Sequence, residues 1–167
     1  MAVSLIGSVV GTNDIPESVR VLGSLPAVDY ADLFILTTDT EATPERWARA
    51  MFGNVPGLAE LLIWRGLLGL RLSRGRSPAT VGGWQIGERG EDWIRLEAAS
   101  AFLSCNLVVR TAEGRVSLGT FLHYDRCLGR SMWPPLSVVH RRVVPGLLRD
   151  AAARAATDSP GADRASW

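Results

Sequence analysis

The sequence predicts an α+β fold in which a curved antiparallel sheet wraps around one long C-terminal helix. Residues 133–156 repeat their apolar positions at the spacing of an amphipathic helix. Residues 84–125 form a run of β-forming segments separated by short turns, and strands joined in this way pair antiparallel. One strand-like segment and two short helical segments precede that run. Because one helix cannot cover a whole sheet, we expect the two short helices to close one end.

Length and composition describe one domain with a sizeable core, since 47% of the 167 residues are apolar. The net charge of +1 gives no electrostatic footprint for nucleic acid. Residues 58–72 are too few and too charged to span a bilayer, and no basic region precedes the apolar N-terminus. We therefore expect no membrane insertion and a cytoplasmic protein, in which Cys105 and Cys127 are reduced, buried thiols.

The folded domain is expected to span residues 25–156. Residues 1–24 hold two short apolar pieces, including a candidate strand at residues 4–10, and we expect an N-terminal extension there. Residues 157–167 have the composition of a flexible tail.

The first half of the domain contains one predicted strand and two predicted helices. Residues 32–38 are β-branched and aromatic, which is typical of a strand. Thr43 and Pro44 suit the N-cap and the first position of a helix that ends near Gly53. A second helix is expected from about residue 56 to residue 70, apolar on nearly every side and therefore buried on more than one side.

The predicted sheet region follows a loop at residues 73–83. Two breaks, at residues 87–92 and 111–114, have the composition of hairpin turns. The strands between and around them are expected at residues 84–88, 93–102, 103–110 and 115–125.

The long helix at residues 133–156 has one apolar stripe when projected at 100° per residue. His140 is the ionisable group near the middle of that stripe, and Pro145 predicts a bend because it removes a backbone hydrogen bond. The stripe contains Leu136, His140, Val143, Leu147 and Ala151, and it is flanked by Val139, Val144, Leu148 and Ala155.

Four stretches of the chain carry a resemblance to a known superfamily. They are LPAVDYADLF (25–34), PGLAELLIWRGLLGLRL (56–72), DWIRLEA (92–98) and LGRSMWPPLSVVHRRVVPGLLRDA (128–151). Taken with the element order, residues 20–156 resemble the START/Bet v1-like (SRPBCC) superfamily with its helix-grip fold, which includes polyketide cyclases. They look most like a bacterial family of unknown function within it. That family often has a His-Asn pair before its Gly-Arg, where this chain reads His123-Tyr124-Asp125. The resemblance implies a fold and an apolar cavity, and no particular reaction.

His140 is the strongest candidate for a catalytic group. A histidine that points into the space between helix and sheet can act as a general acid or base on a carbonyl compound. The alternative is a core histidine bonded to a backbone carbonyl or a hydroxyl. Alternation along residues 116–124 places Thr120 and Tyr124 on the expected concave face, so Tyr124 is the second catalytic candidate and Thr120 a ligand contact. His123 then points outward.

Four further residues complete the expected ligand-binding set. Ser100 belongs to the inward set of its strand, and Trp133 and Leu136 lie on the long helix. Arg130 follows Gly129 at the expected strand-to-helix turn, where it either binds a carboxylate or phosphate or ties the turn to a carbonyl.

Two groups of charged residues are expected to have structural roles. Arg95 and Glu97 should pair on the outer face of the sheet, although a register slip of one residue would bury them next to a ligand. Asp29, Tyr30 and Asp32 lie at the start of the predicted strand, where turn and cap duties are commoner than contact with a ligand at the cavity mouth.

Several known site patterns are missing from the sequence. Two cysteines and two histidines at these spacings fit no zinc site, and the chain has no lysine for a phosphate-binding loop. It also has no dinucleotide fingerprint and no Gly-x-Ser-x-Gly. We therefore expect neither a metal nor a cofactor.

The sequence and the resemblance together predict a protein that binds a small, mostly apolar organic molecule between helix and sheet. The first candidate is a cofactor-independent cyclase, dehydratase or other lyase or isomerase that acts on a polyketide-like substrate. The alternatives are a non-catalytic carrier or sensor and a scaffold with a filled core. A homodimer is compatible with each of them.

Overall fold

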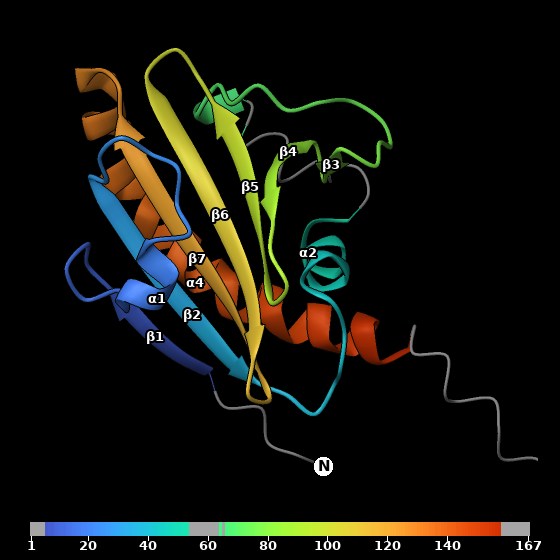
Figure 1. The fold of residues 1–167 in the computed structure, drawn as a ribbon. Helices are drawn as coiled ribbons and strands as arrows, with labels where there is room; N and C mark the ends of the chain where they lie inside the picture. Colours follow the sequence, from blue (N-terminus) through green and yellow to red (C-terminus); the bar gives the residue numbers. More distant parts are fainter. Residues whose placement is uncertain (1–5, 54–63, 65, 158–167) are drawn as a thin grey trace, which may run out of the picture.

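A seven-stranded antiparallel sheet and one long helix form most of the computed structural model, which describes residues 6–53, 64 and 66–157 (Figure 1). The order of the strands across the sheet is β1-β2-β7-β6-β5-β4-β3. The predicted α+β class and antiparallel sheet are therefore confirmed. The strands are β1 (Ile6–Val10), β2 (Tyr30–Thr37), β3 (Thr80–Val81), β4 (Trp84–Arg89), β5 (Trp93–Ala99), β6 (Leu103–Ala112) and β7 (Arg115–Tyr124).

The central strands follow the predicted hairpins. Ala112 pairs with Arg115, so β6 and β7 are joined by a two-residue turn at Glu113 and Gly114, which have φ angles of 51° and 69°. Two positive φ angles are the signature of the hairpin turn that matches the natural twist of strands. The predicted loop at residues 73–83 is only partly correct, because Thr80 and Val81 form β3. Two residues are too few to show the alternation that predicts a strand.

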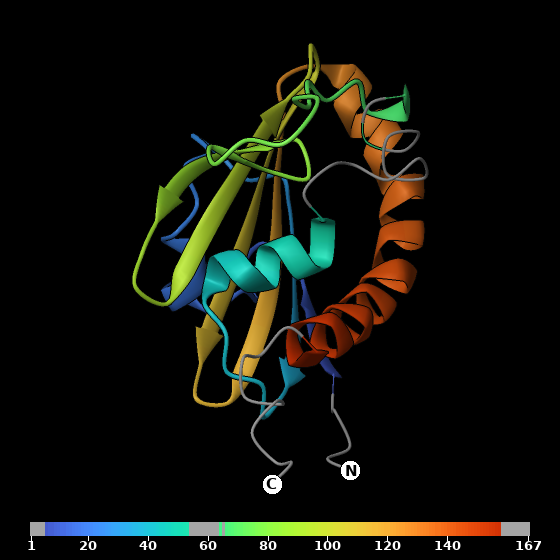
Figure 2. The same cartoon turned by 90° about the vertical axis from the view of Figure 1, so that its right-hand side faces the viewer.

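Helix α2 (Pro44–Phe52) begins and ends where the sequence predicts. The side chain of Thr43 accepts a hydrogen bond from the backbone N–H of Arg46 at 3.2 Å, and Pro44 occupies the first turn. Gly53, with a φ of 72°, ends the helix. Figure 2 shows α2 on the same side of the sheet as the long helix α4 (Cys127–Thr157). The second predicted helix, at about residues 56–70, lies largely outside the described residues.

Helix α4 is longer than predicted and turns a different face to the sheet. It begins at Cys127 instead of residue 133, so Gly129 and Arg130 belong to its first turn and not to a preceding turn. Val139 and Val143, expected to point inward, are 48% and 55% exposed. Its buried residues are Gly129, Trp133, Ser137, Val144, Leu148, Ala151 and Ala155.

The displaced stripe has a physical cause. Residues on both sides of α4 are apolar, since Leu128, Val138, Val139 and Val143 are exposed, and hydrophobicity alone cannot choose between the two sides. The helix also curves along its length and contains three prolines, including Pro145, so a straight projection drifts from the true geometry (Figure 2).

The N-terminal residues are part of the sheet and of its cover. β1 pairs with β2, and helix α1 (Glu17–Arg20) lies on the face opposite α4 (Figure 1). Ile15 and Val19 pack there against Leu33 and Phe121. The residues set apart as an N-terminal extension thus complete a second, smaller core.

The outer register of β5 agrees with the sequence prediction. Nε of Arg95 lies 2.8 Å from Oε1 of Glu97, and the same guanidinium donates to the carbonyl of Leu22 at 2.8 Å. Of the inward set predicted for that strand, Ile94 and Leu96 are fully buried in the main core and Ala98 is partly buried against it.

Two glycines of α4 form a matched pair for testing its docking. A Cβ at Gly129 would lie 2.8 Å from the carbonyl oxygen of Phe102, whereas a Cβ at Gly146 meets nothing within 4 Å. We expect Gly129→Ala to lower the free energy of unfolding by about 1–3 kcal/mol through overpacking. Gly146→Ala should raise it by about 0.5–1 kcal/mol through helix propensity. Denaturant melts of both variants check this, and an unaffected Gly129→Ala protein would contradict the close approach.

Candidate functional site

An aspartate lies on the inner face of β2, under helix α4. Side chains alternate along a strand, so Tyr30 and Asp32 share the inner face with Phe34 and Leu36. Asp32 is 0% exposed, and the antiparallel register places it directly opposite Thr120 of β7. A buried carboxylate is costly unless hydrogen-bond donors reach it.

Three side chains reach Asp32 or its immediate neighbourhood. Nε2 of His140 lies 3.1 Å from Oδ2 of Asp32 and 3.3 Å from Oγ1 of Thr120. The hydroxyl of Tyr30 donates to the same Oδ2 at 2.6 Å. Tyr30, Asp32, Thr120 and His140, drawn from β2, β7 and α4, are called the Asp32 cluster below.

Aromatic rings enclose the Asp32 cluster. The ring of Trp133 lies 5.2 Å from that of Tyr30 and 5.4 Å from that of His140, measured between centroids. The ring of Trp64 lies 6.2 Å from that of His140. Rings and aliphatic chains keep the local dielectric constant low, which strengthens each charge interaction inside.

This environment acts on the acidity of two neighbouring groups. Burial raises the pKa of the Tyr30 phenol, and the charge of Asp32 and the hydrogen bond to it raise it further. Burial, with a smaller effect of the Asp32 charge, also raises the pKa of the Cys105 thiol. Both groups therefore stay protonated, and Tyr30 serves as a hydrogen-bond donor.

Two buried atoms at the cluster have no hydrogen-bond partner in the described part of the chain. They are Oδ1 of Asp32 and Nε1 of Trp133. Buried polar atoms are nearly always paired in native proteins, so each of them calls for an explanation.

The structure brings together some of the predicted site residues. His140 and Thr120 belong to the Asp32 cluster, Trp133 forms its wall, and Leu136 is partly buried against the same core. Tyr124 is partly buried on the inner face, and burial followed by the charge of Asp29 raises its pKa. Among the described residues, however, the polar neighbours of His140 are Asp32 and Thr120 and not Tyr124.

Two other predicted site residues lie elsewhere. The hydroxyl of Ser100 accepts hydrogen bonds from the backbone N–H groups of Phe102 and Leu103, and so closes the turn between β5 and β6. Arg130 is exposed in the first turn of α4. Cys127 is also exposed, contrary to its prediction as a buried thiol, because it begins the helix at the surface.

Sequence reasoning missed Tyr30 and Asp32 as inner-face residues. It assigned both to turn or cap duty at the start of a strand expected from residue 32, whereas β2 begins at Tyr30, and that duty is therefore wrong for Asp32. A signal was present: an acid stands in the alternating series Tyr30, Asp32, Phe34, Leu36. Asp29 does have a structural role, since its Oδ2 accepts from the backbone N–H of Tyr124 and lies 2.9 Å from Nδ1 of His123.

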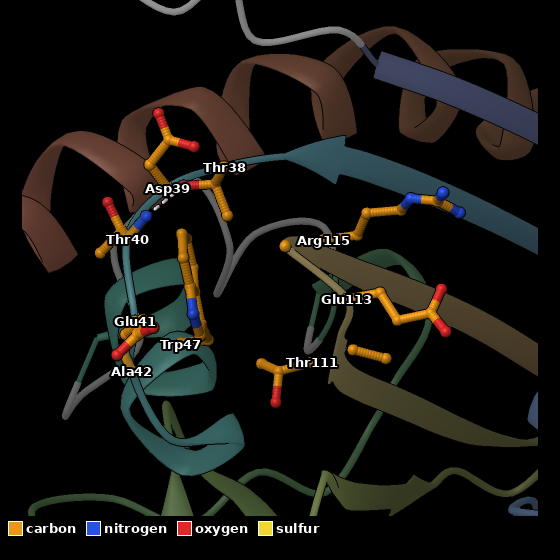
Figure 3. A pocket seen from close by; sticks show the side chains of 11 residues that line it. Thr38, Asp39, Thr40, Glu41, Ala42, Trp47, Thr111, Glu113 and Arg115 are labelled. Atoms are coloured by element: carbon orange, nitrogen blue, oxygen red, sulfur yellow. Dashed lines mark hydrogen bonds between the residues drawn. The ribbon is translucent and has the colours of Figure 1, made fainter.

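A hollow of about 450 Å³ lies apart from the Asp32 cluster, at the turn between β6 and β7 (Figure 3). Trp47 forms one wall, and residues 38–42 and 111–115 form the rest. Its described lining residues leave no buried polar side-chain atom unpaired, so it lacks the sign of a ligand that the Asp32 cluster carries.

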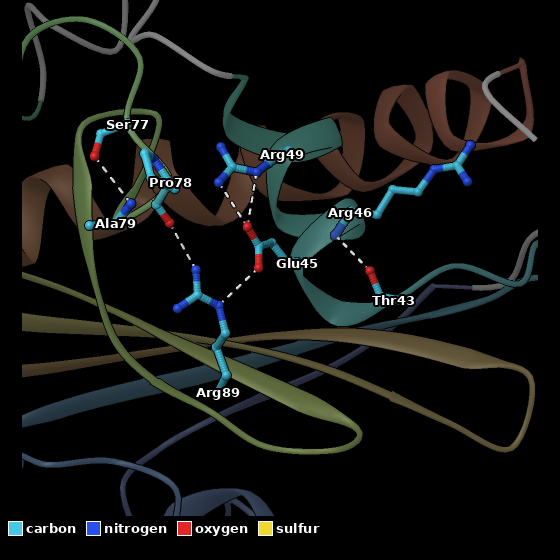
Figure 4. Close-up of polar contacts among 8 residues, drawn as sticks. All are labelled: Thr43, Glu45, Arg46, Arg49, Ser77, Pro78, Ala79 and Arg89. Carbon is cyan, nitrogen blue, oxygen red and sulfur yellow. Dashed lines mark hydrogen bonds and ion pairs between the residues drawn. The ribbon is translucent and has the colours of Figure 1, made fainter.

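A charged network joins α2 to β4 (Figure 4). Glu45 lies 2.8 Å from Nη2 of Arg49 and 2.9 Å from Nε of Arg89. The hydrogen bonds from Arg89 and then Arg49 hold the pKa of Glu45 below its ordinary value. Both oxygens of the Glu45 carboxylate are thereby paired, so this network serves to hold α2 and β4 together.

Comparison of the chain with protein-family models, with curated proteins and with solved structures gives no significant match. Among the described residues, no group of three or more histidine, cysteine or acidic side chains is placed to hold a metal ion. No helix in the described part of the chain is long and apolar enough to cross a membrane.

Removal of the buried carboxylate tests its role in the fold. Asp32→Ala leaves the Tyr30 hydroxyl and His140 without their shared acceptor, and we expect a loss of about 3–5 kcal/mol in the free energy of unfolding. Denaturant melts measure the loss. Asp150→Ala, at an exposed position of α4, is the control and should leave the transition midpoint unchanged. An equally harmless Asp32→Ala would show that the carboxylate is dispensable.

The raised pKa of Tyr30 predicts a dependence of stability on alkaline pH. A group whose pKa is raised on folding contributes stability that is complete below its unfolded pKa and is lost as pH rises through the folded one. For tyrosine the unfolded pKa is about 10. We expect the unfolding free energy of the natural chain to fall more steeply above that pH than the value for Tyr30→Phe. If the unfolding free energies of both proteins, measured by denaturant melts at a series of pH values, fell equally with pH, this prediction would be contradicted.

Proposed function

We propose that this protein binds a small, mostly apolar organic molecule between α4 and the sheet and transfers a proton to or from it through His140. The observation that carries the proposal is the wholly buried Asp32, whose Oδ2 lies 3.1 Å from Nε2 of His140. Burial of an ionisable pair is costly to the fold, which favours a functional reason for keeping it.

The arrangement suits a general base. Nε2 of His140 is occupied by Asp32 and Thr120, and Nδ1 has no hydrogen-bond partner in the described part of the chain, so Nδ1 is the nitrogen offered to a substrate. An aspartate that holds one imidazole nitrogen orients the ring and stabilises the imidazolium formed when the other nitrogen accepts a proton. Removal of a proton next to a carbonyl would then start a cyclisation or a dehydration.

Such chemistry requires no cofactor and fits a cyclase, a dehydratase or another lyase or isomerase acting on a polyketide-like substrate. Apolar side chains around the Asp32 cluster, such as Trp133 and Phe34, would contact the ligand skeleton through dispersion and exclude water. The curved antiparallel sheet with its long helix supports the resemblance to helix-grip proteins and is the basis for proposing that fold.

A non-catalytic carrier or sensor is the second candidate. The unpaired Oδ1 of Asp32 and Nε1 of Trp133 favour a bound polar group, and they do so whether or not a reaction follows. Turnover is the property that separates the two candidates.

Hydrogen–deuterium exchange tests proton transfer without knowledge of the natural substrate. Cyclic and aromatic ketones, such as 2-tetralone and acetophenone, are incubated with the protein in D₂O, and deuterium next to the carbonyl is followed by NMR. We expect the natural protein to accelerate the exchange and His140→Gln to lower that rate by roughly 10²- to 10⁴-fold, the usual effect of losing a general acid or base.

The second histidine supplies the control. His123 lies on the outer face beside Asp29, and His123→Gln should exchange deuterium at the natural rate. A folded His140→Gln protein with full activity would end the catalytic assignment. Ketones that bind without exchange in the natural protein would favour the carrier.

A further inference from the structure

Trp133, which packs against the Asp32 cluster, and Asp32 itself each have a buried polar atom without a hydrogen-bond partner, one a donor and the other an acceptor. Nε1 of Trp133 and Oδ1 of Asp32 have no hydrogen-bond partner in the described part of the chain, although Trp133 is 1% and Asp32 0% exposed. An unpaired buried polar atom is destabilising, and native proteins keep few of them. The two atoms therefore indicate a bound group that the chain does not supply.

Both atoms belong to side chains that border the same two rings. The ring of Trp133 lies 5.2 Å from Tyr30 and 5.4 Å from His140, measured between centroids. The other oxygen of Asp32 accepts from the Tyr30 hydroxyl at 2.6 Å and lies 3.1 Å from Nε2 of His140. Trp133 and Asp32 thus border the same two side chains, Tyr30 and His140.

The two atoms require opposite partners. The indole N–H of Trp133 only donates, and a carboxylate oxygen of Asp32 only accepts. A ketone or an ether accepts without donating, and a carboxylate does the same while also repelling the charge of Asp32. A hydroxyl group both accepts and donates and carries no charge.

We propose that the ligand of this interior carries a hydroxyl group on an apolar skeleton. The hydroxyl oxygen accepts from Nε1 of Trp133, and its proton is donated to Oδ1 of Asp32. This inference rests on the proposed function, because it requires a ligand between α4 and the sheet, and it adds the chemical class: an alcohol or a phenol.

Equilibrium dialysis with three probes of one skeleton tests the inference on the natural protein. The probes are 2-naphthol, 2-methoxynaphthalene, which accepts but cannot donate, and naphthalene, which does neither. We expect 2-naphthol to bind roughly tenfold or more tightly than naphthalene, because it adds two hydrogen bonds, and a few-fold more tightly than 2-methoxynaphthalene, because it adds one. The comparison needs no variant and so does not depend on whether a variant folds.

A pair of tryptophan variants then tests whether Trp133 is the hydrogen-bond donor to the ligand. Trp133→Phe removes the N–H and keeps an aromatic ring, and it should bring the preference for 2-naphthol close to that expected from one hydrogen bond, a few-fold. Trp47→Phe makes the same change at an equally buried tryptophan that lines the hollow of Figure 3, and it should keep the full preference.

The outcomes separate failure of the inference from failure of the proposed function. Equal binding of all three probes would overturn the hydroxyl assignment, with a buried water left to serve the two atoms, while ligand binding itself would stand. If Trp133→Phe kept the full preference for 2-naphthol, the assignment of Trp133 as the hydrogen-bond donor would be wrong. Binding of none of the probes would overturn both this inference and the proposed interior site.

Discussion

The buried carboxylate of Asp32 is the constraint on which the inner face of this fold depends. A charge with no exposure is stable only where donors reach it, so the Tyr30 hydroxyl and His140 must remain within hydrogen-bond distance. That requirement restricts where His140 of α4 can lie over β2 and β7. Apolar packing of residues such as Leu148 holds the helix against the sheet, but the polar contact at Asp32 decides which part of the helix lies there.

The two ends of α4 are held in different ways. At its start, Gly129 approaches the carbonyl of Phe102 so closely that no larger residue fits without a shift. At its end, the guanidinium of Arg154 donates to the carbonyl of Ala50 at 2.8 Å and links the helix to α2. Between them the helix curves along its length (Figure 2). The interior beneath that curve contains the Asp32 cluster.

The enclosure of the cluster links stability to chemistry. The same low dielectric constant that keeps Tyr30 protonated makes the pairing of His140 with Asp32 strong, and it would favour a proton transfer shielded from water. It also makes a polar atom without a hydrogen-bond partner more destabilising, and Oδ1 of Asp32 and Nε1 of Trp133 are two such atoms. A catalytic site and a carrier site would share all of these features, and only turnover distinguishes them.

Local patterns in the sequence determined the class of the fold, the central hairpin of the sheet, the ends of α2 and the inward direction of Thr120. Alternation, caps and turns are set by neighbours in the chain, and the sequence contains them directly. Only the tertiary structure decided that Asp32 meets His140, residues 108 positions apart in sequence, and that α4 leaves Val143 exposed. Both sides of α4 are apolar, so the choice between them was made by fit against the sheet, and the partner of His140 was set by the pairing of β2 with β7.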